Sequence, residues 1–151
     1  MQNKISHLEL DKLTFLTEVP TYIALLIASA DSEISLKETS WAEKVLSFRI
    51  KSAHHTLRAY YQSAHDFYKN NIESILAALP ENQSERMQYL SDKIASVNSS
   101  LSQIDEITKE RMIDSYKSLA LSIAEIDGGI FNFFASNPEE EKWLHLPMIA
   151  H

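Results

Sequence analysis

Residues 24–41 read ALLIASADSEISLKETSW, an apolar run that reaches Asp31 and is followed by a polar stretch and a second segment containing Trp41. The apolar run predicts a buried helix, because hydrophobic residues occupy every side of its turns. Ser35 and Glu38, three residues apart, form a capping box that predicts the start of a second helix. The stretch therefore predicts two helices joined by an acidic bend.

A second copy of this bend lies near the other end of the sequence. Residues 120–130 match the first apolar run without a gap, with Asp127 in the place of Asp31. The register then shifts by six residues, after which Trp143 matches Trp41. The chain has two tryptophans, and both fall at the same position of the copy. We therefore predict an internal repeat covering about 19–46 and about 116–146.

Asp31 and Asp127 each follow the carboxyl end of an apolar helix, where a negative charge opposes the helix dipole by about 0.3–1 kcal/mol. Either an Asx turn that closes the loop or a cation held by loop oxygens would offset this cost, and the sequence leaves both open. Glu38 and Glu140 read equally well as helix caps. The candidate metal ligands are Asp31, Glu33, Glu38, Asp127, Glu139 and Glu140.

Residues 30–38, ADSEISLKE, resemble the Ala-Asp-Gly-x-Ile-x-x-x-Glu signature of the tellurite-resistance TerB-like family. The resemblance covers the two repeat segments. It implies a compact all-helical domain of two related halves, loop acids that bind a metal ion, and a role in the metal and stress response of bacteria. The sequence departs from the signature at Ser32, where glycine is usual, and by an insert around 131–134 in the second copy.

Composition narrows the class of protein. A chain of 151 residues with 44% hydrophobic residues suits one folded domain. Two glycines and four prolines are too few for a turn-rich β-fold, and the absence of cysteine excludes disulfides and thiolate metal sites. A net charge of −7 argues against nucleic-acid binding. The longest apolar run, residues 22–30, is shorter than the ~20 residues of a membrane span, and no signal peptide is visible, so we expect a cytoplasmic protein.

Apolar periodicity predicts the remaining helices. Residues 8–18 form a short amphipathic segment that Pro20 ends or kinks. A helix over 36–52 places Trp41, Val45 and Phe48 on one apolar face. Two long helices span about 54–104, with a turn at Pro80 that predicts an antiparallel hairpin. A break follows between 99 and 106, capped by Ser102 or Asp105, and a last helix covers about 138–146.

The expected fold is therefore all-α. We expect residues 1–151 to form a single-domain bundle of about six or seven helices, with two related halves and a long central hairpin. No stretch alternates hydrophobic and polar residues over a length that would predict a sheet.

The sequence offers little catalytic chemistry. No histidine has the spacing of a helical zinc or di-iron ligand. The first bend fails as an EF-hand, because Leu36 stands at the glycine position and Ala42 at the glutamate position. No serine lies in a nucleophile signature, so we expect a non-enzymatic protein.

The cluster Phe131, Phe133 and Phe134 has two interpretations: the rings fill the core between the copies, or they form an apolar surface for a partner. Two functions follow. One is a TerB-like stress- or metal-response domain that binds a divalent cation through its two acidic bends. The alternative is a metal-free helical module that binds an unidentified protein through the phenylalanine loop.

Overall fold

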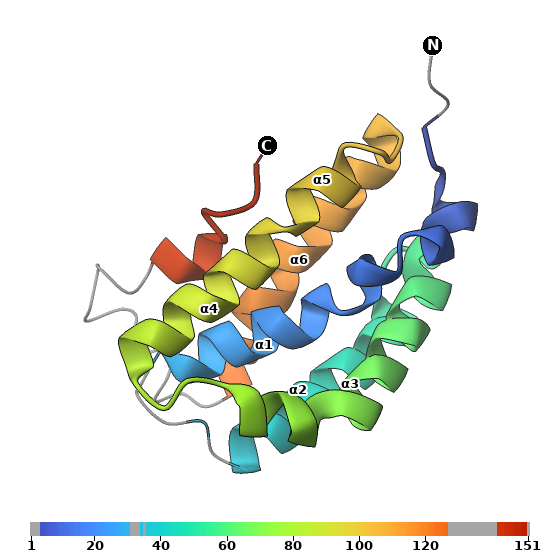
Figure 1. Ribbon diagram of the computed structural model, residues 1–151. Coiled ribbons are helices and arrows are strands. Elements are labelled where there is room, and N and C mark those ends of the chain that lie inside the picture. Colours follow the sequence, from blue (N-terminus) through green and yellow to red (C-terminus); the bar gives the residue numbers. More distant parts are fainter. Residues whose placement is uncertain (1–3, 31–33, 35, 127–141, 151) are drawn as a thin grey trace.

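The computed structural model describes residues 4–30, 34, 36–126 and 142–150, which form helices joined by short turns (Figure 1). These residues contain no β-strand, and an isolated bridge pairs Ile5 with Ile104. The all-α prediction is confirmed. The α-helices are α1 (Val19–Ser29), α2 (Leu36–Ser52), α3 (Arg58–Ala78), α4 (Gln83–Ala95), α5 (Val97–Leu101) and α6 (Glu106–Ile126). The 3-10 helices are η1 (His7–Lys12), η2 (Thr14–Thr17), η3 (His55–Leu57) and η4 (Lys142–His145).

Helix α1 is the centre of the fold. Every residue from Val19 to Ser29 is buried, and the helix packs against α2, α3, α4 and α6. Figure 1 shows α1 in the middle, with α4 along one side and α3 along the other. Because its sequence has no polar face, α1 is stable only when it is covered on all sides. The predicted buried helix is therefore confirmed.

The segment before α1 differs from the prediction. Instead of one amphipathic helix over 8–18, the chain forms η1 and η2, which meet at Leu13. Pro20 does not end a helix; it lies in the first turn of α1, where its missing N–H costs no hydrogen bond. Leu10 and Leu16 are buried and anchor the two short helices on the core.

The predicted pairing of the two long central helices is wrong. The connection from Ala78 to Gln83 is short, as expected. The two helices nevertheless diverge, because α3 packs mainly on α2 while α4 packs on α1. Helix α1 lies between them (Figure 1). Burial of the all-apolar helix α1 requires neighbours on both of its sides. This burial stabilises the fold more than direct pairing of α3 with α4 would.

Side-chain caps place several helix ends where the sequence predicts them. Asn82 Oδ1 accepts the Glu85 N–H at 3.0 Å and begins α4 after the predicted turn. Asp105 Oδ1 accepts the Thr108 N–H at 2.9 Å at the start of α6, which confirms Asp105 as the cap after the break. A further interruption at Ser96 separates α4 from α5; the unbroken apolar spacing of the sequence did not predict it.

Helix α2 has the predicted bounds but buries a different face. Ala42 and Leu46 are buried, whereas Trp41 is 39% exposed and Phe48 is 69% exposed. The apolar face expected from Trp41, Val45 and Phe48 therefore does not enter the core, and only Val45 is partly buried against it. The prediction was based on the large side chains of α2. The small side chain of Ala42 instead faces the core, where it lets the neighbouring helices pack closely against α2.

The second copy of the repeat is described only in part. Of its predicted last helix over 138–146, the structure describes residues 142–146, in which Lys142–His145 form the 3-10 helix η4. Trp143 in η4 is partly buried against the core, whereas Trp41 is exposed, so the two tryptophans have different surroundings. Residues 127–141 lie outside the described part of the chain. The two related halves and the number of helices stay predictions. Within the described ranges, no helix combines the length and hydrophobicity that a membrane crossing requires.

Candidate functional site

The predicted acidic site lies almost entirely outside the residues that the structure describes. Of its six carboxylates, only Glu38 is described, and it is partly buried in the first turn of α2. The other predicted ligands, and the predicted partner residues, fall outside: Asp31, Glu33, Asp127, Glu139, Glu140, Phe131, Phe133 and Phe134. Among the residues that are described, no group of three or more histidines, aspartates or glutamates is placed to hold a metal ion. The predicted cation site therefore stays a prediction.

The helices that lead into the two acidic bends are placed together. Helices α1 and α6 pack side by side, and Figure 1 shows their carboxyl ends at the same end of the bundle. Helix α1 ends at Ser29, two residues before Asp31, and α6 ends at Ile126, directly before Asp127. The last helical residues before the two bends therefore lie at one end of the molecule.

A buried arginine lies at the carboxyl end of α1. Arg86 of α4 is 8% exposed; its Nε donates to Ser29 Oγ at 3.1 Å, and its Nη1 donates to the Glu81 carbonyl at 3.0 Å. The side-chain amide of Gln83 donates to the carbonyls of Ser29 and Ala30, both at 3.0 Å. The two bonds from Gln83 satisfy carbonyls that the end of α1 leaves without a partner.

Arg86 carries a positive charge at the end of α1, the helix that precedes the first predicted cation-binding bend. A positive group at the carboxyl end of α1 is favourable for the helix dipole. The protein therefore supplies a positive charge of its own at the end of α1. No local sequence pattern identifies Arg86 and Gln83, because both lie more than 50 residues from the helix end that they contact.

A mostly apolar groove lies between α2 and α6. We call it the α2–α6 groove; it measures about 250 Å³. Its lining is mostly apolar and consists of Trp41, Lys44, Val45, Phe48, Arg49, Ser52 and Ser122. Nearby on α6, Leu121 is 39% exposed.

Polar side chains fix the shape of the groove. Arg49 Nη2 donates to Ser118 Oγ at 2.7 Å and to Ser122 Oγ at 3.1 Å, which ties α2 to α6. Lys44 Nζ lies 5.0 Å from the centre of the Trp41 ring, a cation–π contact that holds the indole. The walls of the groove are therefore joined by contacts within the protein.

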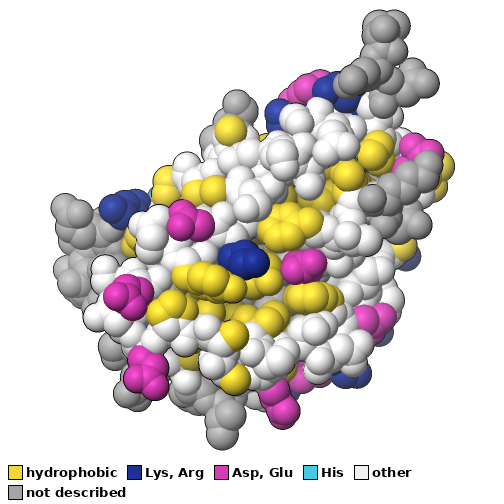
Figure 2. Space-filling view, viewed as in Figure 1, with side chains coloured by type: hydrophobic (Ala, Val, Ile, Leu, Met, Phe, Trp, Pro, Cys, Tyr) yellow, Lys and Arg dark blue, Asp and Glu magenta, His cyan; other side chains and the backbone are white. Residues whose placement is uncertain are grey.

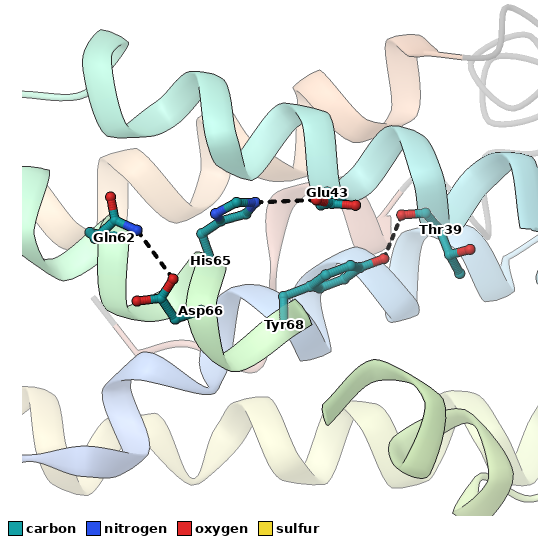
Figure 3. A network of polar contacts seen from close by, with 6 residues as sticks. All are labelled: Thr39, Glu43, Gln62, His65, Asp66 and Tyr68. Carbon is teal, nitrogen blue, oxygen red and sulfur yellow. Dashed lines mark hydrogen bonds and ion pairs between the residues drawn. The ribbon is translucent and has the colours of Figure 1, made fainter. Parts of the chain in front are cut away.

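The opposite side of α2 is held on α3. Figure 3 shows Tyr68 of α3 pointing at Thr39 and His65 pointing at Glu43. The Tyr68 hydroxyl donates to the Thr39 carbonyl at 2.6 Å, and His65 Nε2 lies 3.6 Å from Glu43 Oε1. Burial, and then the nearby Glu43 carboxylate, raise the pKa of Tyr68, so its hydroxyl stays protonated and keeps donating. Helix α2 is thus fixed on both sides.

A buried tyrosine pair joins the amino-terminal segment to the core. Tyr60 hydroxyl donates to the Leu16 carbonyl at 2.6 Å and lies 2.7 Å from the Tyr116 hydroxyl. Because the Tyr60 proton is used on Leu16, Tyr116 is the donor within the pair. Burial raises the pKa of both tyrosines. Each hydroxyl therefore acts as a fixed structural group that links η2, α3 and α6.

The face drawn in Figure 2 also carries hydrophobic side chains, which gather in a band over α1, between α4 and α3. Here Lys93 Nζ lies 5.8 Å from the Tyr22 ring centre and 5.7 Å from the Tyr89 ring centre, bridging α1 and α4. Tyr22 is only 5% exposed, whereas Phe48 in the α2–α6 groove is 69% exposed. Tyr89 is 36% exposed, so both rings of this contact are less exposed than Phe48.

Comparison with known proteins adds no assignment. A scan against protein-family models and searches of curated proteins and of solved structures found no match to this chain. The function is therefore inferred from the residues and their geometry.

Proposed function

We propose that this protein is a non-enzymatic helical module that binds a protein partner, and that the α2–α6 groove is its docking surface. The observation that carries the proposal is the exposure of Phe48, at 69%, beside Trp41, at 39%, on a groove whose walls are fixed. Full burial of a phenylalanine side chain gives about 1.5–3 kcal/mol, and the exposed ring of Phe48 forgoes most of this stabilisation. Partner binding recovers this energy.

The composition of the groove suits an interface. Tryptophan and arginine are enriched among the residues that dominate binding energy, and they act best at the centre of a water-excluding contact. Trp41 and Arg49 both line the groove. The hydrogen bonds from Arg49 to Ser118 and Ser122 reduce the ordering that a partner would have to bring about.

Site-specific cross-linking tests the proposal. A photoreactive phenylalanine analogue is placed at Phe48 and, as the matched control, at Ile107 on α6, an apolar residue that is 64% exposed and does not line the groove. We expect a discrete cross-linked adduct from position 48 in extracts of the native host, lost when Trp41→Ala is added. The same adducts from both positions, or none from position 48, would contradict a docking role for the groove.

A second candidate function has separate support. In it, the chain is a cytoplasmic, TerB-like domain of two related halves and about six or seven helices, which binds a divalent cation at its acidic bends. The support is the parallel packing of α1 and α6, which brings the residues before Asp31 and Asp127 to one end of the bundle. The proposed ligands are Asp31, Glu33, Glu38, Asp127, Glu139 and Glu140.

Thermal unfolding separates this second candidate from the first. A cation that binds only the folded chain raises the melting temperature, and the increase grows with the logarithm of its concentration relative to its Kd. Calcium, magnesium, manganese and zinc are titrated into the parent chain and into the double variant Asp31→Asn, Asp127→Asn. An increase that the double variant abolishes supports the cation site; no increase with any ion, or the same increase in both, rejects it. Neither result affects the cross-link at Phe48.

A further inference from the structure

The residues that line the α2–α6 groove follow one side of α2. Trp41, Val45, Phe48 and Ser52 follow one another along α2 at spacings of four and three residues. At 1.5 Å per residue this stripe is about 16 Å long, or three turns. Ser122 of α6 forms the other wall. A seam between two packed helices is the surface on which a third helix packs in a bundle.

Backbone hydrogen bonding favours a helix over an extended peptide in this groove. An extended peptide needs a strand edge to pair its N–H and C=O groups. The walls of the groove are α2 and α6, whose backbone groups are bonded within their own helices, and the described part of the chain offers no strand. A helical ligand satisfies its own backbone and needs only side-chain contacts.

The charged residues around the groove indicate which charge a partner should carry. Lys44 and Arg49 line it, and no carboxylate does so among the described residues. Lys51 is exposed on α2, seven residues from Lys44 and therefore on the same side of the helix. The whole chain has a net charge of −7, so the groove differs in sign from the protein around it. Such a local reversal attracts a ligand with carboxylates.

We propose that the α2–α6 groove binds an acidic amphipathic helix of a partner protein. Apolar side chains of that helix, spaced three and four residues apart, cover Trp41 and Phe48, and its flanking glutamates or aspartates face Lys44, Arg49 and Lys51. The inference rests on the proposed docking function of the same groove. A membrane surface is disfavoured, because the site is concave and a chain of net charge −7 is repelled by anionic lipid.

The fluorescence of Trp41 provides a direct test. The full chain carries Trp143→Phe, which leaves Trp41 as its only tryptophan. Two synthetic helical peptides share the same leucine stripe and differ only in carrying glutamate or lysine on the flanks. We expect the glutamate peptide to shift the Trp41 emission and to bind at least about tenfold more tightly than the lysine peptide at low salt. The variant Lys44→Glu, Lys51→Glu should reverse this preference.

The outcomes separate the partner class from the docking function. Equal binding of the two peptides, or a preference for lysine, overturns the acidic partner and leaves the groove as a docking surface. No response to either peptide also overturns it, and the cross-link at position 48 then decides the proposed function by itself. A Trp41 response to phosphatidylserine vesicles but not to peptides would assign the groove to membranes. A dimer, seen by ultracentrifugation and lost in Phe48→Glu, would assign it to a second copy; both results overturn the inference.

Discussion

The guanidinium of Arg49 on α2 lies between Ser118 and Ser122 on α6, with its Nη2 atom 2.7 Å from the first hydroxyl oxygen and 3.1 Å from the second. The two serines are one helical turn apart, so one side chain spans a turn of the neighbouring helix. Hydrogen bonds from a charged donor are stronger than neutral ones. The relative position of the two groove walls therefore depends on this contact.

Replacing Arg49 with methionine, which keeps the apolar stem, should lower the free energy of unfolding by about 1 kcal/mol, because the cross-helix hydrogen bonds are lost at a partly solvated site. Urea unfolding measures the change. Arg58→Met, at an exposed arginine at the start of α3, is the matched control and should change stability little. Equal losses in the two variants would show that the bonds to Ser118 and Ser122 contribute nothing measurable.

Because Tyr60 donates to Leu16 and accepts from Tyr116, we expect the two tyrosine-to-phenylalanine variants to lose different amounts of stability. Tyr60→Phe removes the donor to the Leu16 carbonyl and the acceptor for Tyr116, and should cost about 2 kcal/mol. Tyr116→Phe removes only a donor, because Tyr60 still bonds to Leu16, and should cost about 1 kcal/mol. Denaturant unfolding of both variants tests this order. A larger loss from Tyr116→Phe would reverse the assignment of the donor.

The buried tyrosines also predict a loss of stability at alkaline pH. Burial raises the pKa of Tyr60 and Tyr116, and burial followed by the Glu18 carboxylate raises the pKa of Tyr22 to about 12. In the unfolded chain tyrosine ionises near pH 10. The unfolded state therefore loses protons first, and stability, fully present below about pH 10, falls as the pH rises further. Unfolding free energies at pH 8–11.5 should show this decline, reduced in Tyr116→Phe; a flat profile would contradict it.

Arg86 should be one of the most sensitive polar positions of the described core. Arg86→Met removes the bonds to Ser29 and to the Glu81 carbonyl and should destabilise the protein by about 2–4 kcal/mol, since buried acceptors lose a charged donor. Arg86→Lys keeps the charge but not the fork of donors, and should recover only part of the loss. Full recovery by lysine, measured by urea unfolding, would show that charge alone acts at the end of α1.

The fold could be predicted from the sequence where local signals are strong. The all-apolar run over α1 identified the buried helix, and Asp105 was one of two residues expected to cap the helix after the break, because capping is a contact within four residues. The pairing of helices was not predictable in this way. The short turn at Pro80 favoured a hairpin. The helices α3 and α4 instead lie on opposite sides of α1, because α1 is apolar on every face and is buried by both of them.

The candidate site was harder to predict for a related reason. The predicted acids of the two bends lie outside the described residues, apart from Glu38, and stay a prediction. The groove was present in the sequence as the stripe Trp41, Val45 and Phe48, but size and hydrophobicity cannot distinguish a stripe that packs inward from one that faces a partner. The contact of Arg49 with α6 joins residues 69 and 73 positions apart, and no local pattern predicts it.

Two neighbouring positions of α2 separate binding from folding. Phe48 is 69% exposed and Leu46 is 0% exposed. Phe48→Ala should change the unfolding free energy by less than about 0.5 kcal/mol, because a solvated ring contributes little to the core, while Leu46→Ala should cost about 2–5 kcal/mol. The same Phe48→Ala change should abolish the Trp41 fluorescence response to the acidic peptide. A large stability loss from Phe48→Ala would show that this ring supports the fold, and its exposure would then no longer indicate a binding surface.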